Sequence, residues 1–175
     1  MINTFILSNM TPQHDRFNRC TWRWLEENER EWAKLKGEIY VITGAIFDHD
    51  GDDKRDADSN VPRIETLRRV ALPSHFYKII LHTRPNTFVE SMTFILPHVD
   101  NNRPFNQRNQ VLQAHLDKIE TVEALTGNTF LKSLAAEDPA KAQAVRRFKA
   151  QAMWSEPVKE PELLDQICNS WAGQQ

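Results

Sequence analysis

The apolar positions of this chain recur with two different periods, which predict both strands and helices. Short, densely apolar runs predict strands at 3–8, 38–47, 70–81 and 88–96. Apolar residues three or four positions apart predict helices at 15–36, 112–127, 138–153 and 161–171. Because the last two predicted strands follow each other through a short turn, we expect an α+β fold with an antiparallel sheet.

Two of the predicted helices carry boundary signals. Pro12 breaks the pattern of the first strand, and Gly37 stands where the helix 15–36 should end. Asp138 and Pro139 have the residue types of an N-cap and a first helical position, so the helix 138–153 should begin there.

Composition fits one globular domain. The chain has 175 residues, of which 40% are hydrophobic and 26% charged, and it shows no repeat or linker. Cys20 and Cys168 are its two cysteines, and they define neither a disulfide scaffold nor a zinc site. No apolar run is long enough for a membrane helix, so we expect no membrane insertion.

Net charge gives no support for binding a polyanion. The formal net charge is −2 and the pI is about 6.3, so no global positive field favours nucleic acid. Arginines do concentrate locally, in two groups: Arg16, Arg19 and Arg23, then Arg63, Arg68 and Arg69. Such charges either solvate a helix face or line a cleft, and charge alone favours the first interpretation.

The segment 48–60 is acidic, and its alternating aspartates invite comparison with a calcium loop. In an EF-hand count from Asp48, however, Gly51 stands at the fourth position rather than the sixth, and Ser59 replaces the final glutamate. The EF-hand pattern therefore fails, and we interpret this segment as a solvated hairpin tip.

The predicted helix 15–36 has a polar residue in an unusual position. On an α-helical wheel Asn18 falls inside the apolar arc with Trp22 and Leu25, while Glu26 lies at about 80° and Arg30 at about 120° from it. A buried Asn must satisfy its hydrogen-bonding groups. Asn18 can do so in the first helical turn, through a neighbouring strand, or by offering its carbonyl oxygen to a hard cation. Glu26 and Arg30 are four residues apart, which by itself predicts a surface ion pair.

The first predicted strand begins almost at Met1, whereas most domains begin with a few polar residues. Two interpretations fit this observation. Either Met1 lies inside the domain of a longer protein, or the chain starts here and the strand lies at a sheet edge.

These residues belong to one ordered string: Ser8-Asn9, Pro12-Gln13, Phe17-Asn18, Trp22, Leu25-Glu26 and Arg30. The string resembles the S-N-x-x-P-Q and N-x-x-x-W-x-x-L-E-x-x-x-R patterns of the DNA/RNA non-specific endonuclease family, the ββα-metal nucleases. Runs at 40–44, 72–78, 94–97 and 119–127 resemble later family segments in the same order. The resemblance covers residues 3–134, so we expect a nuclease-like domain at 1–134 and a helical C-terminal extension at 135–175.

The resemblance implies a metal-site helix and a set of site residues. Asn18 stands at the position of the family's Mg²⁺ ligand, with Mn²⁺ as a second candidate ion. Because Mg²⁺ keeps most of its waters, one protein oxygen and a substrate phosphate can hold it. Glu26 matches a glutamate that holds water on the metal, Arg30 an arginine that contacts substrate phosphate, and Asn9 an asparagine near the active site. DNA and RNA are the implied substrates, and the family includes dimers.

One family motif is missing from the chain. The family's D-R-G-H motif, whose histidine activates the attacking water, lies upstream of S-N-x-x-P-Q, and no D-R-G-H occurs here. We therefore expect an N-terminally truncated nuclease that cleaves poorly or not at all, since loss of a general base costs roughly 10²–10⁴-fold. The alternatives are a non-catalytic protein that binds nucleic acid or a partner, and an enzyme completed by a separately encoded piece. By resemblance alone, we expect a secreted or periplasmic location.

Overall fold

An antiparallel sheet forms the centre of the computed structural model, in which residues 11–64, 70–84, 89–99 and 107–154 are described. Four strands lie in the order β1 (Tyr40–Ile46), β4 (His75–Thr83), β5 (Val89–Pro97) and β6 (Leu116–Asp117). Each neighbouring pair is antiparallel. Two short strands, β2 (Arg63–Ile64) and β3 (Val70–Ala71), form a second antiparallel pair. The predicted antiparallel sheet is therefore confirmed.

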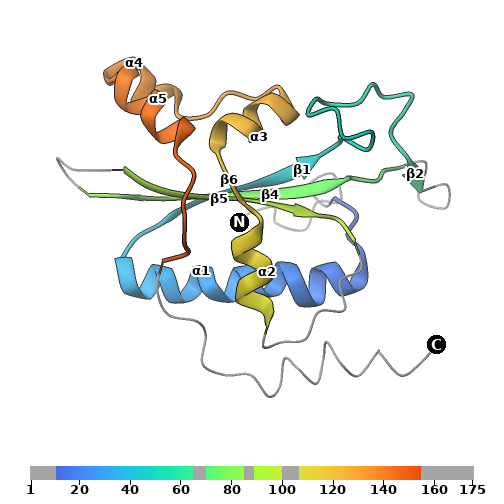
Figure 1. The fold of residues 1–175 in the computed structure, drawn as a ribbon, viewed down its shortest axis with the longest axis horizontal. Helices are drawn as coiled ribbons and strands as arrows, with labels where there is room; N and C mark the ends of the chain where they lie inside the picture. The colour runs from blue at the N-terminus through green and yellow to red at the C-terminus, as the bar shows by residue number, and fades with distance from the viewer. Residues whose placement is uncertain (1–10, 65–69, 85–88, 100–106, 155–175) are drawn as a thin grey trace, which may run out of the picture.

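Helices cover both faces of the sheet (Figure 1). One face carries the π-helical turn η2 (Phe17–Trp22), α1 (Arg23–Lys36) and α2 (Arg108–Ala114). The other carries α3 (Ile119–Thr126), α4 (Lys132–Glu137) and α5 (Pro139–Arg147). The predicted α+β class is confirmed, and the arrangement is consistent with a ββα-metal nuclease fold. None of the helices in the described part of the chain has the length and apolar character needed to cross a bilayer.

β4 is one of the two inner strands, and its side chains alternate between two apolar clusters. Phe76 and Ile80 belong to the cluster that packs under α1. Tyr77 and Ile79 belong to the cluster under α3 and α5. Because successive strand side chains point to opposite faces, Lys78 is directed at α1, like its neighbours two positions away.

Residues 15–36 form one helical stretch, as predicted. Gly37 ends it with φ of 89°, a conformation that other residues rarely adopt, and its N–H donates to the Ala33 carbonyl at 2.9 Å. The segment Phe17–Trp22 departs from α-helical geometry, because it is a π-helix with i→i+5 hydrogen bonds.

The prediction of one continuous strand over 70–81 is wrong. It is broken after Ala71, and β4 begins at His75. The N–H of Ser74 donates to the Ile46 carbonyl at 2.9 Å, and the preceding Pro73 has no N–H with which to continue a ladder.

The helix predicted over 112–127 is also wrong. α2 ends at Ala114, and Leu116 pairs with Phe94 of β5 before α3 begins. Leu112, Leu116 and Ile119 are all buried, as their spacing suggested, but a helix, a strand and a second helix bury them in turn.

The helix predicted over 138–153 begins as expected but ends at Arg147. Asp138 is its N-cap, since its Oδ1 accepts a hydrogen bond from the Lys141 N–H at 2.9 Å, and Pro139 is the first helical residue. The predicted elements 3–8 and 161–171 lie outside the described residues.

Residues 148–154, which we call the crossing segment, lead from the layer of α5 to the α1 face (Figure 1). Ala150 belongs to the cluster under α1. The Trp154 carbonyl accepts a hydrogen bond from Nε1 of Trp32 at 2.8 Å, and the Trp154 N–H donates to Sδ of Met92 at 3.3 Å. The crossing segment therefore contacts the side of the sheet that faces away from α5.

Candidate active site

The π turn η2 changes which residues of the first helix share a face. The hydrogen bonds of a π turn join residues i and i+5 instead of i and i+4, so the turn contains one extra residue. Every later residue is therefore rotated about the helix axis by about 100° less than in a regular α-helix. Relative to Asn18, Glu26 moves from about 80° to about 340°, and Arg30 moves from about 120° to about 20°. From this geometry we infer that the three residues fall on one side of the helix, which we call the helix stripe; Glu26 and Arg30 also line one pocket.

The same shift takes Asn18 out of the apolar arc, so the prediction that it lies there is wrong. Leu25 and Trp32, both 0% exposed, move to about 240° and about 220° from Asn18. Asn18 is exposed, and its carboxamide makes no hydrogen bond with any residue that the structure describes. The α-helical wheel failed because it assumes a constant rotation per residue.

Glu26 is partly buried and meets a lysine of the sheet. Its side chain is 39% exposed, and its Oε1 lies 3.8 Å from Nζ of Lys78, whose side chain is 5% exposed. Glu29 is the nearer partner of Lys78, with Oε1 at 2.6 Å from Nζ. The same Nζ lies 4.6 Å from the ring centroid of Trp22. Within the described residues, Glu26 thus pairs with Lys78 and not with Arg30.

Sequence reasoning missed Glu29 and Lys78. Burial raises the pKa of the Glu29 carboxyl above its ordinary value, because desolvation disfavours the charged form, while the charge of Lys78 opposes this effect. Repulsion from Glu26 adds a smaller upward shift of the Glu29 pKa. A signal for Lys78 was present, since it is the one charged residue in the apolar run 76–81.

Arg30 is exposed and makes no hydrogen bond or ion pair with any described residue. Together with four other residues it lines an open pocket of about 370 Å³ beside α1: Glu26, Glu29, Ala33 and Ile39. An exposed guanidinium at such a pocket is suited to bind an anionic group such as a phosphate.

The other predicted site features contribute less. Asn9 lies outside the described residues. Arg19 and Arg23 form ion pairs one helical turn away, with Asp15 at 2.7 Å and with Glu27 at 3.1 Å. These two arginines therefore fit a solvated helix face, which is the interpretation that charge alone favoured.

All six histidines lie within the described residues, and the fold engages most of them. Five have a ring nitrogen within 3.0 Å of a backbone carbonyl or a serine hydroxyl: His49, His75, His82, His98 and His115. The ring of the sixth, His14, packs against that of His98 with centroids 4.3 Å apart. Each of these contacts fixes the orientation of a ring within the fold.

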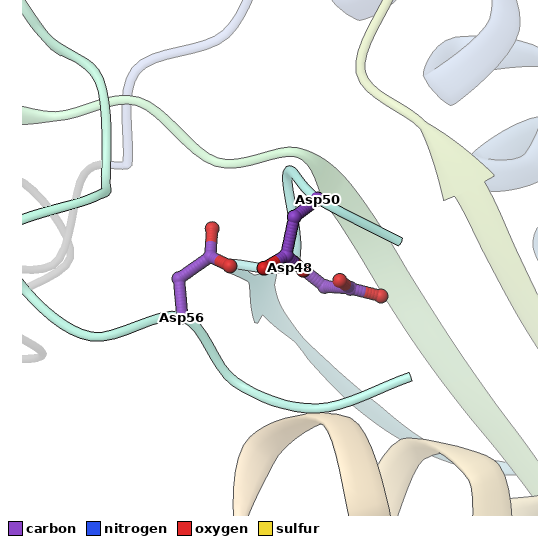
Figure 2. Close-up of side chains that lie close together, drawn as sticks. All are labelled: Asp48, Asp50 and Asp56. Carbon is purple, nitrogen blue, oxygen red and sulfur yellow. The ribbon is translucent and has the colours of Figure 1, made fainter. Parts of the chain in front are cut away.

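The acidic loop after β1 brings three carboxylates together (Figure 2). Asp48, Asp50 and Asp56 each offer an oxygen within 4.8 Å of the others, which is a hard-cation donor set. Each carboxylate also accepts a backbone N–H of the same loop, which accounts for the cluster without an ion. The loop joins β1 to β2, which do not pair, so the predicted hairpin is wrong. The predicted exposure to solvent is confirmed for most of residues 49–60, while Asp48 is 6% exposed.

Comparison with known proteins identifies the family of the chain. Residues 1–137 match the family model of the DNA/RNA non-specific endonucleases. The chain belongs to this family, which confirms the resemblance found in the sequence.

Named relatives show how much of a family member is present here. Over 137 residues the chain is 29% identical to mitochondrial endonuclease G of Homo sapiens. This alignment covers 78% of this chain and 44% of that protein. It is 34% identical over 139 residues to nuclease C1 of Cunninghamella echinulata var. echinulata, covering 77% and 51% respectively. Mitochondrial nuclease 1 of Schizosaccharomyces pombe is 29% identical over 138 residues, covering 77% and 41%. The chain thus spans about half the length of these relatives.

Proposed function

We propose that this chain carries the metal-binding helix of an Mg²⁺-dependent endonuclease that hydrolyses DNA and RNA without sugar preference. The helix stripe of Asn18, Glu26 and Arg30 is the observation that carries the proposal. It combines a neutral oxygen donor, a carboxylate and a guanidinium that has no hydrogen-bond or ion-pair partner among the described residues. A hydrated cation and a phosphodiester require groups of these kinds.

The donor set fits a hard divalent cation. Asn18 offers an exposed amide oxygen that makes no hydrogen bond within the described part of the chain, and Glu26 offers a partly exposed carboxylate. Asn18 would hold Mg²⁺ or Mn²⁺, while Glu26 would accept hydrogen bonds from the water around the ion. A bound divalent cation supplies positive charge that offsets the negative charge developing on the phosphate.

Arg30 would bind the substrate through its phosphate. Its planar guanidinium can donate two parallel hydrogen bonds to phosphate oxygens, and no ion pair within the described residues has to be broken first. Contacts to phosphate carry no information about base or sugar, which supports an activity on both DNA and RNA.

We further propose that the general base comes from a D-R-G-H segment that is not part of this sequence. The proposal is supported by the lack of a D-R-G-H motif in the sequence, and a general base contributes roughly 10²–10⁴-fold to rate. The chain alone would then bind the metal ion while cleaving nucleic acid poorly.

Binding of Mn²⁺ alone tests the metal site without requiring activity. Free Mn²⁺ is measured by electron paramagnetic resonance in titrations of the full chain. We expect Asn18→Ala to abolish specific binding and Glu26→Ala to weaken it by about 10- to 100-fold, as for other groups that support a metal site indirectly. Glu31→Ala is the matched control, since Glu31 pairs with Lys34 on the same helix and should leave binding unchanged. Wild-type affinity in Asn18→Ala would refute the assignment.

Chemical rescue tests the missing base. Supercoiled plasmid and a single-stranded RNA are incubated with the chain and Mg²⁺, with and without added imidazole. We expect slow cleavage that imidazole accelerates in the wild type and not in Asn18→Ala. Salt-sensitive binding to both polymers without imidazole-dependent cleavage would instead favour a non-catalytic binding protein.

A further inference from the structure

Lys78 is a buried cation in the middle of an apolar strand. Its side chain is 5% exposed, and its neighbours on the same face of β4, Phe76 and Ile80, belong to the cluster under α1. A buried ammonium group is costly unless charged or polar partners surround it. An apolar residue at this position would complete the cluster, so the presence of a lysine requires an explanation.

The partners of Lys78 all come from the first helix. Its Nζ lies 2.6 Å from Oε1 of Glu29, 3.8 Å from Oε1 of Glu26 and 4.6 Å from the ring centroid of Trp22. Glu29 alone would neutralise the lysine. The second carboxylate is the one that reaches the helix stripe, since the Glu26 side chain is 39% exposed while that of Glu29 is 14% exposed.

We propose that Lys78 is a positioning residue of the metal site, which holds the Glu26 carboxylate in place from beneath the helix. The inference rests on the function proposed above and adds a residue of the sheet to the stripe. Lys78 attracts one oxygen of Glu26 towards β4, which leaves the other oxygen of this carboxylate for the stripe that contains Asn18.

Loss of Lys78 would disturb Glu26 in a definite way. Glu29 lies one turn away from Glu26, and Nζ of Lys78 is within 3.8 Å of a carboxylate oxygen of both. Without Lys78, the two carboxylates would lose the cation that they share. Glu26 would then no longer be held towards β4.

A second lysine offers a matched control. Nζ of Lys36 lies 2.5 Å from Oε2 of Glu90 and 4.9 Å from the ring centroid of Trp154. This arrangement has the same chemistry as that of Lys78, but its carboxylate is on β5 and is not part of the helix stripe.

The test is the Mn²⁺ affinity of the full chain, measured by electron paramagnetic resonance. We expect Lys78→Met to weaken binding by about 10- to 100-fold, the range typical of groups that orient a metal site indirectly. Lys36→Met should bind Mn²⁺ like the wild type. Circular dichroism and thermal unfolding establish which variants are folded.

A double variant separates positioning from mere neutralisation of Glu29. Lys78→Met with Glu29→Gln leaves no unpaired buried carboxylate, so it should fold even where Lys78→Met alone does not. If Lys78 positions Glu26, the double variant remains about 10-fold or more weaker than the wild type and than Glu29→Gln alone. Recovery of wild-type affinity in the double variant would overturn the inference.

Failure of the proposed function gives a different result. In that case the wild type either does not bind Mn²⁺ or binds it equally well after Asn18→Ala. The proposed role of Lys78 is then wrong as well. If binding is present and depends on Asn18 but is the same with and without Lys78, the proposed function stands and this inference alone is wrong.

Discussion

Gly44 on β1 lies directly opposite Tyr77 on β4, and a Cβ at Gly44 would come within 2.6 Å of the tyrosine ring. The ring of Tyr77 therefore occupies the space that a side chain at position 44 would need. The glycine of the run at 40–44 is explained by this contact and not by an unusual backbone conformation.

Gly44→Ala should therefore destabilise the protein by about 1–3 kcal/mol, the usual cost of overpacking a core. Urea unfolding measures the change in the free energy of unfolding. In a Tyr77→Ala background the same substitution should cost less than about 0.5 kcal/mol, because the two residues are coupled by direct contact. Equal costs in the two backgrounds would show that Tyr77 is not the obstacle.

The π turn predicts an unusual tolerance to deletion. If Arg19 is deleted, the helix can become regular, and Asn18 and Glu26 are then seven residues apart, which again places them about 340° apart. We expect this variant to fold and to keep its Mn²⁺ affinity within about threefold, since the helix stripe is preserved.

Deletion of Glu27 is the contrasting variant. No π turn lies beyond this residue to absorb the change, so Trp32 and Arg30 would rotate by about 100° relative to Glu26. We expect loss of Mn²⁺ binding and a large drop in thermal stability. Equal tolerance of the two deletions, judged by circular dichroism and Mn²⁺ titration, would contradict the geometry of the stripe.

The carboxyl of Glu29 should make stability depend on pH in a particular direction. Burial raises its pKa in the folded state, so the folded protein holds this proton to higher pH than the unfolded chain does. Its contribution to the free energy of unfolding is therefore greatest below the ordinary glutamate pKa and falls as pH rises through the raised value.

Glu29→Gln removes this titration. The stability of the variant relative to the wild type should increase as pH rises from the ordinary glutamate pKa to above the raised one, and then level off. Urea unfolding at a series of pH values, with Glu31→Gln as a surface control, measures this difference. A difference that decreases with rising pH would mean that Lys78 outweighs the desolvation of Glu29.

Arg30 can be tested through binding alone. Because Arg30 is exposed and makes no hydrogen bond or ion pair with the described residues, Arg30→Ala should change thermal stability little. Its affinity for a short oligonucleotide should fall by about tenfold, since a hydrogen bond to a charged group contributes about 1.5–3 kcal/mol.

The salt dependence of this binding provides the specific readout. Arg30→Ala should reduce the slope of log affinity against log salt by about one, as expected for the loss of one phosphate contact. Arg147→Ala is the control, because Arg147 lies on α5, on the opposite face of the sheet. An unchanged slope in Arg30→Ala would exclude a phosphate contact at this residue.

The sequence predicted those parts of the fold whose signals are local. Gly37 ends the first helix and Asp138 caps α5, because glycine conformation and capping chemistry depend on neighbouring residues alone. The two long strands were also found, since β4 and β5 are dense apolar runs. Leu116 was misassigned because a two-residue strand is too short to show alternation, and its pairing with Phe94 is a long-range contact.

The candidate site was predicted in part. Asn18, Glu26 and Arg30 were named from the family resemblance, but their common face was not, because the wheel assumed an α-helix throughout. A single π turn of six residues is too short to leave a periodic signal in the sequence. Lys78 is distant in sequence from Glu26. Their contact could be predicted only with knowledge of how β4 lies against the helix.

The crossing segment has a consequence for how the protein melts. The indole N–H of Trp32, which is 0% exposed, has its acceptor in the carbonyl of Trp154. If α5 detached and drew this segment away, that N–H would be left without a partner in an apolar environment. Detachment of the α5 layer would therefore also destabilise the packing of α1 on the sheet. We expect the two helical layers to unfold as a single cooperative unit.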